Sequence, residues 1–102
     1  MEFIFANKIL IDLYTIGKSK KIKLSKNLVK KFIERINRIE AADTINDLRN
    51  PPSMKFERLE GYENRFSIRL NIEYRLEFEI DFEDSEKLRG KATIPRVSKH
   101  YK

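Results

Sequence analysis

The apolar residues of this chain change their spacing at Pro51-Pro52, and that change restricts the folds open to it. Between Lys26 and about Ala41 they recur at the spacing of an amphipathic helix. Beyond the two prolines they alternate with polar residues, the period-two pattern of a strand with one buried face. Helices followed by such strands predict an α+β domain, with the helices covering one face of an antiparallel sheet and the other face open.

The first half of the chain predicts one short strand and two helices. Phe3 to Phe5 has strand character, and Asn7 to about Ile16 has a single apolar face. Gly17 is expected to end this first helix, because glycine readily adopts the left-handed conformation found there. Ser25 is the expected N-cap of the second helix, over 26–41.

The second helix has a cationic surface beside its apolar stripe. Lys30, Lys31 and Arg35 are expected to lie on this outer surface. We expect one further capped turn after the helix. Pro51-Pro52 should then stop helical structure, because proline lacks the backbone N–H that a helix needs.

Alternation in the second half predicts three strands. The segments 65–71 and 74–80 are joined through 71–73, so a hairpin is expected. The segment 92–98 should form the last strand. Pro95 places that strand at a sheet edge or at a bulge, because proline cannot donate to the ladder.

Arginines rather than apolar residues occupy the predicted open face of the sheet. Arg65, Arg69 and Arg75 all fall on the polar side of their strands. We therefore expect the function to lie on this face. The acidic segment 81–86 lacks the glycine and regular spacing of a calcium loop, and is interpreted as a solvated turn.

Composition limits the chain to one domain, residues 1–102, and favours an anionic partner. At 102 residues there is room for one hydrophobic core. The net charge of +6 suits a polyanion such as RNA, although lysine and arginine also simply keep small proteins soluble. Cysteine is absent, and no signal peptide or apolar run of about 18 residues is found, so a cytoplasmic protein without membrane contact is expected.

RNA cleavage without a metal needs few protein groups, and this chain offers them. The ribose 2′-hydroxyl is the nucleophile, so a base, an acid and a cation suffice. Glu57, His100 and Arg75 are candidates for these roles, and Tyr101 for base stacking or as a phenolic donor. With one histidine and no cysteine, neither a metal nor a cofactor is expected. On residue types alone, a surface His-Tyr and a cross-strand Arg–Glu pair are the more frequent explanations of such residues.

The order and spacing of several segments resemble the RelE/ParE superfamily of toxins, and within it the HigB-type plasmid-maintenance killers. The Tyr-Arg-Leu-x-Phe strand after Gly61 is the most specific of them. The segments that carry the resemblance are Ala42 to Asn50, Glu57 to Leu59, Gly61, Arg65 to Ile68, Tyr74 to Phe78 and Val97 to Lys102.

The resemblance implies a fold and an activity. It implies two N-terminal helices packed on a curved antiparallel sheet. It also implies a metal-independent endoribonuclease that enters the ribosomal A site and cuts mRNA by 2′-hydroxyl attack. HigB-type toxins usually have a histidine where this chain has Glu57, a lysine near Glu60 and an Asp-Tyr-His ending, all of which differ here.

The YoeB branch resembles this chain at those positions, with a glutamate, the strand arginine and a terminal His-Tyr. By that resemblance Glu57 is the base, Arg75 stabilises the phosphorane, His100 is the acid and Tyr101 positions base or phosphate. The further residues assigned to RNA contact are Lys99, Lys102, Arg58, Arg65, Arg69, Lys30, Lys31 and Arg35.

The resemblance also implies partners, and it leaves alternatives open. The expected partners are a HigA-like helix-turn-helix antitoxin, the ribosome and mRNA, with operator DNA reached only through the antitoxin. A toxin of the same fold that does not cut RNA, such as a gyrase poison, would not need Glu57 and His100. A killer-suppression role is the weakest alternative, because no helix-turn-helix pattern is present in the sequence.

Overall fold

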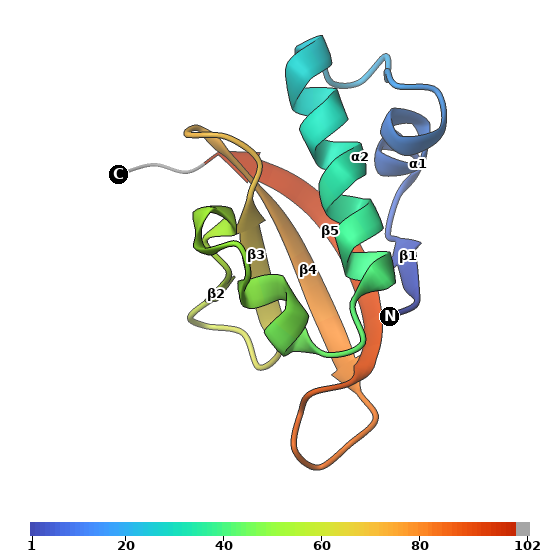
Figure 1. Ribbon diagram of the computed structural model, residues 1–102. Helices are drawn as coiled ribbons and strands as arrows, with labels where there is room; N and C mark the ends of the chain where they lie inside the picture. The colour runs from blue at the N-terminus through green and yellow to red at the C-terminus, as the bar shows by residue number, and fades with distance from the viewer. Residues whose placement is uncertain (100–102) are drawn as a thin grey trace.

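A five-stranded sheet with two helices on one face forms the frame of the protein (Figure 1). The computed structural model describes residues 1–99. The strands lie in the order β1-β5-β4-β3-β2. The elements, in chain order, are β1 (Phe3–Phe5), α1 (Lys8–Thr15), α2 (Lys26–Ala41), the 3-10 helices η1 (Ile45–Arg49) and η2 (Pro52–Met54), β2 (Glu57–Arg58), β3 (Arg65–Arg69), β4 (Tyr74–Phe82) and β5 (Gly90–Lys99).

Side-chain caps fix where the helices begin. The Asn7 side chain accepts from the Leu10 N–H at 3.2 Å, and Ser25 accepts from the Leu28 N–H at 3.1 Å, which confirms Ser25 as the N-cap of α2. Gly17 follows α1 with a φ of 81°, as expected for a residue that ends a helix.

A capping box begins η1, and the prolines behave only in part as predicted. Thr44 caps η1, and the Asp47 carboxylate accepts the backbone N–H groups of Thr44 and Asp43. Hydrogen bonding to the charged form lowers the pKa of Asp47. η1 ends at Arg49, before Pro51-Pro52, as expected. The prolines do not exclude all helical structure, however, because a separate 3-10 turn, η2, begins at Pro52, where a missing N–H costs nothing.

The sheet is mixed rather than antiparallel. β3, β4 and β5 pair antiparallel, as predicted, and β2, which the sequence did not predict, pairs antiparallel with β3. β1, in contrast, pairs with β5 in parallel, with Phe3 opposite Ala92 and Phe5 opposite Ile94. Residues 6–56, which include both helices, separate β1 from the next strand, so the direction of β1 is set by long-range packing rather than by a hairpin. The predicted curvature of the sheet stays a prediction.

Pro95 lies at a bulge, as the sequence predicted, in a strand that is internal to the sheet. Glu77 pairs with Arg96 and Glu79 with Thr93, so two residues of β5 face the single residue between them on β4. β1 pairs with β5 only as far as Ile94, so no strand pairing on that side requires the backbone N–H that Pro95 lacks.

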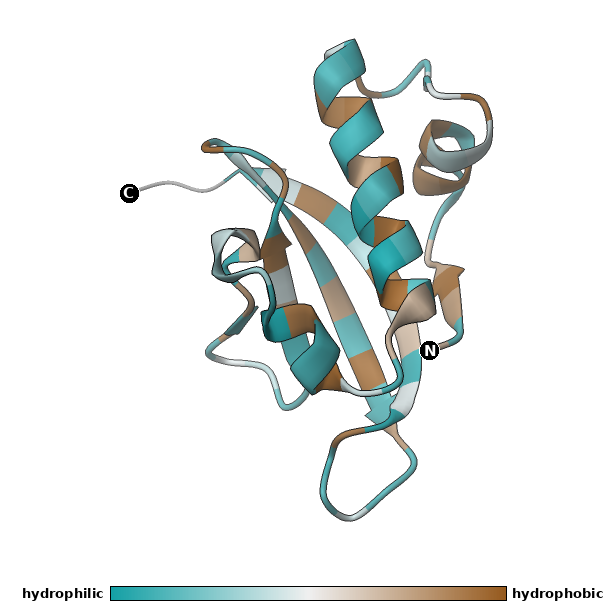
Figure 2. Cartoon of the chain, viewed as in Figure 1, coloured by the Kyte–Doolittle hydropathy of each residue, from teal (hydrophilic) through white to brown (hydrophobic). Residues whose placement is uncertain are grey.

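The core lies between α2 and the helix-facing side of the sheet. Phe32, Ile36 and Ile39 of α2 are fully buried against apolar residues of β3, β4 and β5, which alternate with polar ones as expected (Figure 2).

The acidic segment follows β4 and connects it to β5, at the end of the sheet away from the β3–β4 hairpin. There the Asp84 carboxylate accepts backbone N–H groups of Arg89 and Leu88, which lowers its pKa and makes the segment a closed turn.

Candidate active site

The sheet face opposite the helices, called here the open face, arranges its polar side chains in rows across the strands. Register places Glu57, Ser67, Glu77 and Arg96 in one row over β2, β3, β4 and β5. The next row holds Arg69 directly opposite Arg75. Like charges directly opposite each other destabilise a sheet, so this pair is unfavourable for the stability of the sheet itself.

Arg75 contacts Glu57 and Ser67 at the centre of this face. Its Nη1 donates to Glu57 Oε2 at 2.7 Å and to the Ser67 hydroxyl oxygen at 3.3 Å. The Arg75 side chain is 13% exposed and that of Glu57 is 50% exposed. The Arg75 guanidinium therefore donates to the buried Ser67 hydroxyl, whereas the Glu57 carboxylate is half exposed to solvent.

A second charged cluster lies beside this pair. Glu77 is only 4% exposed, and its Oε2 accepts from Arg96 Nε at 2.9 Å. Arg65 lies 3.7 Å from Glu77 and 3.4 Å from Glu79, without a well-aligned hydrogen bond from its Nε. The face expected to be open is thus partly closed by its own arginines, which bury Glu77 and Ser67.

The residues assigned to RNA contact fall on three surfaces rather than one. Arg65 and Arg69 lie on the open face with Arg75. Lys30 and Lys31 are exposed on α2, where they line a hollow beside the β3–β4 hairpin. Arg58 faces the other side of β2, opposite Phe66, and donates to the Glu63 carbonyl at 2.7 Å.

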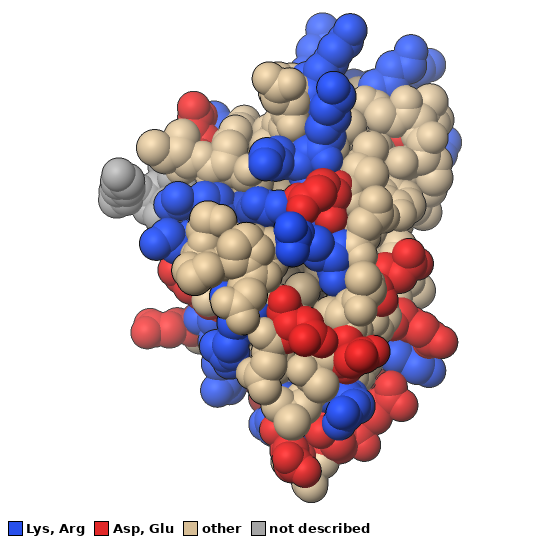
Figure 3. Space-filling view, viewed as in Figure 1, with Lys and Arg blue, Asp and Glu red and all other residues tan. Residues whose placement is uncertain are grey.

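Two of these surfaces meet at one end of the molecule. Lys99 lies at the end of β5 opposite Tyr74, with its Nζ 5.7 Å from the ring centre. This is the hairpin end of the sheet, near which Lys30 and Lys31 project. Figure 3 shows that this upper end is rich in lysine and arginine, whereas carboxylates gather toward the opposite end.

The prediction that Arg35 lies on the outer surface of α2 is wrong. Arg35 is 9% exposed; its Nε donates to the Arg69 carbonyl at 3.0 Å and its Nη1 pairs with Glu34. The side chain ties α2 to the end of β3 instead of facing solvent. His100, Tyr101 and Lys102 lie outside the described residues.

The described chain has neither a metal-binding cluster nor a membrane-spanning helix. Residues 1–99 contain no cluster of three or more histidine, cysteine, aspartate or glutamate side chains suited to a metal ion. None of the helices in this range has the length and apolar character needed to cross a membrane.

Residues 3–90 match the family described as the RelE-like toxin of the type II toxin–antitoxin system HigB. The chain belongs to this family. The match extends over both helices, β2 to β4 and the first residue of β5, and so includes Glu57 and Arg75. The resemblance to the RelE/ParE superfamily drawn from the sequence is thereby confirmed.

Individual proteins agree with this family. An uncharacterised protein of Haemophilus influenzae is 42% identical over 60 residues, which is 58% of this chain and 59% of that protein's length. The solved YoeB/ParE toxin from Agrobacterium tumefaciens superposes with a TM-score of 0.58 at 18% identity, covering 99% of this chain and 100% of that one. The YoeB dimer from Staphylococcus aureus gives a TM-score of 0.57 at 20% identity, over 99% and 98%. At these identities the two structures show the shared fold alone.

Sequence reasoning missed one part of this site. The hydroxyl of Ser67 accepts from Arg75, and the residue types alone do not single out this serine. Register contained the necessary signal, because a hairpin through 71–73 pairs Arg69 with Arg75 and therefore brings Ser67 into the adjacent row.

Proposed function

We propose that this family member is a metal-independent endoribonuclease that cuts mRNA on the ribosome and so inhibits translation. The observation that carries the proposal is the contact between Arg75 and Glu57 on the open face, with Ser67 holding the same guanidinium. This contact places a cation that can bind a phosphate, Arg75, beside an exposed carboxylate that can accept a proton, Glu57.

The proposed reaction is a transesterification within the RNA. Glu57 takes the proton of the 2′-hydroxyl, and the 2′-oxygen forms a bond to the adjacent phosphorus. The P–O5′ bond then breaks, which leaves a 2′,3′-cyclic phosphate on one fragment. His100 gives a proton to the departing 5′-oxygen, so that the second fragment ends in a hydroxyl.

Arg75 has the electrostatic role in this scheme. A guanidinium carries five N–H donors in a rigid fork that matches the paired oxygens of a phosphate, and Nη1 of Arg75 contacts Glu57 and Ser67. In the proposal this guanidinium holds the scissile phosphate beside the base. As negative charge builds on the phosphorane oxygens, a nearly buried cation stabilises it more than an exposed one would.

Sequence proximity supports the role of the C-terminal residues. Ser98 is the register partner of Arg75, and His100 and Tyr101 follow it closely in the chain. In the proposal His100 acts as the acid, since an imidazole titrates near neutral pH, and Tyr101 positions a base or phosphate.

The basic end of the molecule is proposed to hold the RNA backbone. Lys30, Lys31, Arg69 and Lys99 approach this end from α2 and from two strands. Binding that neutralises phosphates releases counterions, so affinity should fall steeply with salt. The proposal includes a cytoplasmic location and a helix-turn-helix antitoxin of the HigA kind, through which the toxin reaches operator DNA.

The test is to induce the protein in cells that lack its neighbouring gene and to map mRNA 5′ ends. Wild type should arrest growth and produce new ends within coding frames. Arg75→Ala and His100→Ala should each remove most of these ends, whereas Arg89→Ala, an exposed arginine of the acidic turn, should not. Growth arrest without new ends would refute the nuclease and indicate a toxin that acts by binding, such as a gyrase poison.

A further inference from the structure

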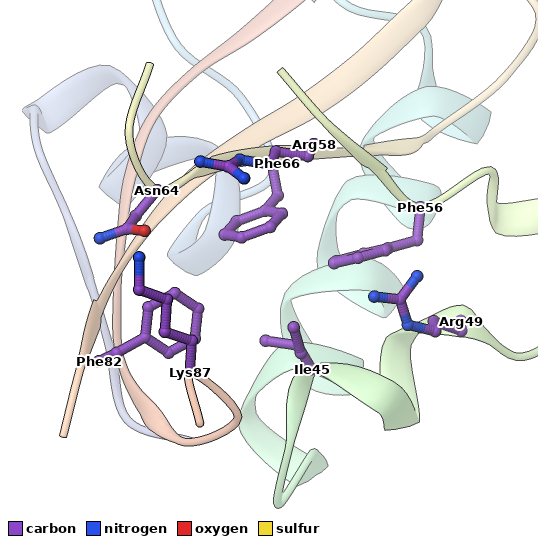
Figure 4. Close-up of a pocket in the computed structure, with 8 residues that line it drawn as sticks. All are labelled: Ile45, Arg49, Phe56, Arg58, Asn64, Phe66, Phe82 and Lys87. Carbon is purple, nitrogen blue, oxygen red and sulfur yellow. The ribbon is translucent and has the colours of Figure 1, made fainter. Parts of the chain in front are cut away.

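A pocket of about 240 Å³ lies at the β2 edge of the sheet, on the side that faces the helices (Figure 4). We call it the edge pocket. Its apolar wall consists of Phe56, Phe66 and Phe82. The Phe56 and Phe66 rings stack with centres 5.3 Å apart, and Phe82 meets Phe66 edge-on at 6.1 Å. The Arg49 guanidinium lies over the Phe56 ring, 5.0 Å from its centre, whereas Phe82 is only partly buried and offers ring surface to a ligand.

Three cations line the same pocket. They are Arg49 from η1, Arg58 from β2 and Lys87 from the acidic turn. Within residues 1–99 none of the three forms an ion pair; Arg49 bonds the Asn46 side chain and Arg58 a backbone carbonyl. Three cations gathered around aromatic rings without carboxylates point to an anionic ligand with a flat apolar part.

Two residues with left-handed backbone lie in or next to the edge pocket. Lys55 has a φ of 50° and Lys87 a φ of 57°, and these are the only non-glycine residues of the described chain with positive φ. Lys55 immediately precedes Phe56, and Lys87 itself lines the pocket. Left-handed backbone costs a lysine about 1 kcal/mol or more, and such strain gathers at binding sites.

The edge pocket is close in sequence to the proposed active site. Glu57 and Arg58 are neighbours on β2, and successive strand residues point to opposite faces. Glu57 thus faces Arg75, while Arg58 lines the pocket on the other side of the same edge strand. A polyanion that crosses the open face and passes around β2 would meet the pocket next.

We propose that the edge pocket binds one nucleotide of single-stranded RNA adjacent to the segment held at Arg75. The base packs on the phenylalanine wall, and Arg58 and Lys87 contact its phosphate. Asn64, whose amide lines the pocket and offers both a donor and an acceptor, contacts the edge of the base. This inference rests on the proposed function, because it takes the RNA to be the strand that reaches Arg75.

Chemistry favours a nucleotide over an acidic peptide at this place. Both would neutralise the cations, but only a base makes use of the flat ring surface and the Asn64 amide together. The volume is below the roughly 300–1,000 Å³ of pockets that enclose drug-sized molecules, which suits a single ring system.

The test measures binding of short fluorescein-labelled single-stranded RNAs by fluorescence anisotropy, with Arg75→Ala as the parent so that no RNA is cut. The double variant Arg58→Gln/Lys87→Gln should bind about tenfold more weakly, and its salt dependence should be shallower by about 1.4, since each phosphate contact on a single strand contributes about 0.7. The matched control is Arg89→Gln/Lys91→Gln, which removes the same two residue types from exposed positions outside the pocket.

Two substitutions probe recognition of the base. Phe82→Leu keeps an apolar side chain and should weaken binding about fivefold or more, because it removes a stacking surface worth about 1–3 kcal/mol. Asn64→Ala should reduce the difference in affinity among homopolymers of the four bases. Circular dichroism confirms that each variant is folded.

Two results would overturn the inference without refuting the proposed function. The first is equal RNA binding by the pocket variant and its control; if mRNA cutting that depends on Arg75 persists, the proposed function survives alone. The second is that the pocket variant loses binding to an acidic, phenylalanine-containing peptide but keeps its binding to RNA, which would make the pocket a protein-binding site. Weakened RNA binding in the pocket variant, with no mRNA cutting by wild type in cells, would support the pocket and refute the nuclease. Failure of the parent to bind any RNA would refute both.

Discussion

Replacing Glu57 by glutamine separates its proposed chemical role from its structural one. Glu57 Oε2 accepts from Arg75 Nη1 at 2.7 Å, but its side chain is 50% exposed, so solvent screens the pair. Pairs of this kind contribute at most about 1 kcal/mol to stability, and glutamine retains an oxygen that accepts the same hydrogen bond. A small domain stable by about 5–15 kcal/mol stays almost entirely folded after such a loss.

The expected loss of activity is far larger. Removing a general base slows a reaction by about 10²–10⁴-fold. A loss of at most about 1 kcal/mol in stability leaves the protein folded, so unfolding cannot explain such a decrease in rate. The assay is the initial rate of mRNA cleavage in a reconstituted translation mixture, with urea unfolding of the same preparations. We expect Glu57→Gln to cut at least about 100-fold more slowly while unfolding within about 1 kcal/mol of wild type.

Glu79→Gln is the matched control for this experiment. Glu79 lies on the same sheet face, is 51% exposed and pairs with Arg65 at 3.4 Å, yet the proposed reaction gives it no role. Its cleavage rate should equal that of wild type. Cleavage by Glu57→Gln within tenfold of wild type, or an equal loss in both variants, would refute Glu57 as the base.

Three other substitutions test the frame and the assignment of the cations. Gly90→Ala should lower the free energy of unfolding by about 3 kcal/mol in urea titrations, because its new Cβ would lie 2.2 Å from the Asp81 carbonyl oxygen. Arg35→Met should cost about 1–3 kcal/mol by leaving the Arg69 carbonyl without its donor, yet leave the salt dependence of RNA binding unchanged. Asp47→Asn should flatten the loss of stability in acid: a carboxyl whose pKa is lowered by folding stabilises above its unfolded-state pKa, and this contribution disappears as the pH falls through the folded-state pKa.

Each of these has a clear contrary result. Wild-type stability of Gly90→Ala would mean that β4 and β5 are not packed as closely as described. A shallower salt slope for Arg35→Met would restore Arg35 as an RNA contact. An unchanged acid profile for Asp47→Asn would show that the capping box contributes nothing measurable, and circular dichroism at a series of pH values records it.

Local patterns predicted the elements that local interactions determine. Ser25 begins α2 because its hydroxyl caps the helix, and the hairpin over 71–73 forms because Asn71 accepts the N–H groups of Glu73 and Tyr74 at 2.8 Å each. The parallel pairing of β1 with β5 joins the two ends of the described chain, and no local signal encodes it.

Arg35 was misplaced although its spacing carried the information. Leu28, Phe32, Arg35 and Ile39 follow one another at intervals of four, three and four residues, which is the apolar stripe of a helix. Its charge suggested an exposed position, but a buried backbone carbonyl provided a partner. The position of a polar residue within an apolar stripe therefore predicts its burial better than its charge does.

Only part of the candidate site could be predicted from the sequence, because only part of it depends on local patterns. Alternation assigned Arg75 to the open face, and the resemblance to known toxins added Glu57. The support from Ser67 depended on strand register, and the edge pocket on segments that are far apart in sequence, so neither followed from any local pattern.

The position of β5 inside the sheet affects when this protein can become functional during its own synthesis. Residues 90–99 are made last of the described chain, yet β1 and β4 both pair with them. Until β5 leaves the ribosome, β1 has no partner strand and the row that contains Ser98 beside Arg75 does not exist. A nascent chain that lacks β5 therefore cannot complete the sheet, and the candidate site gains its row at Ser98 only after the last described strand has emerged.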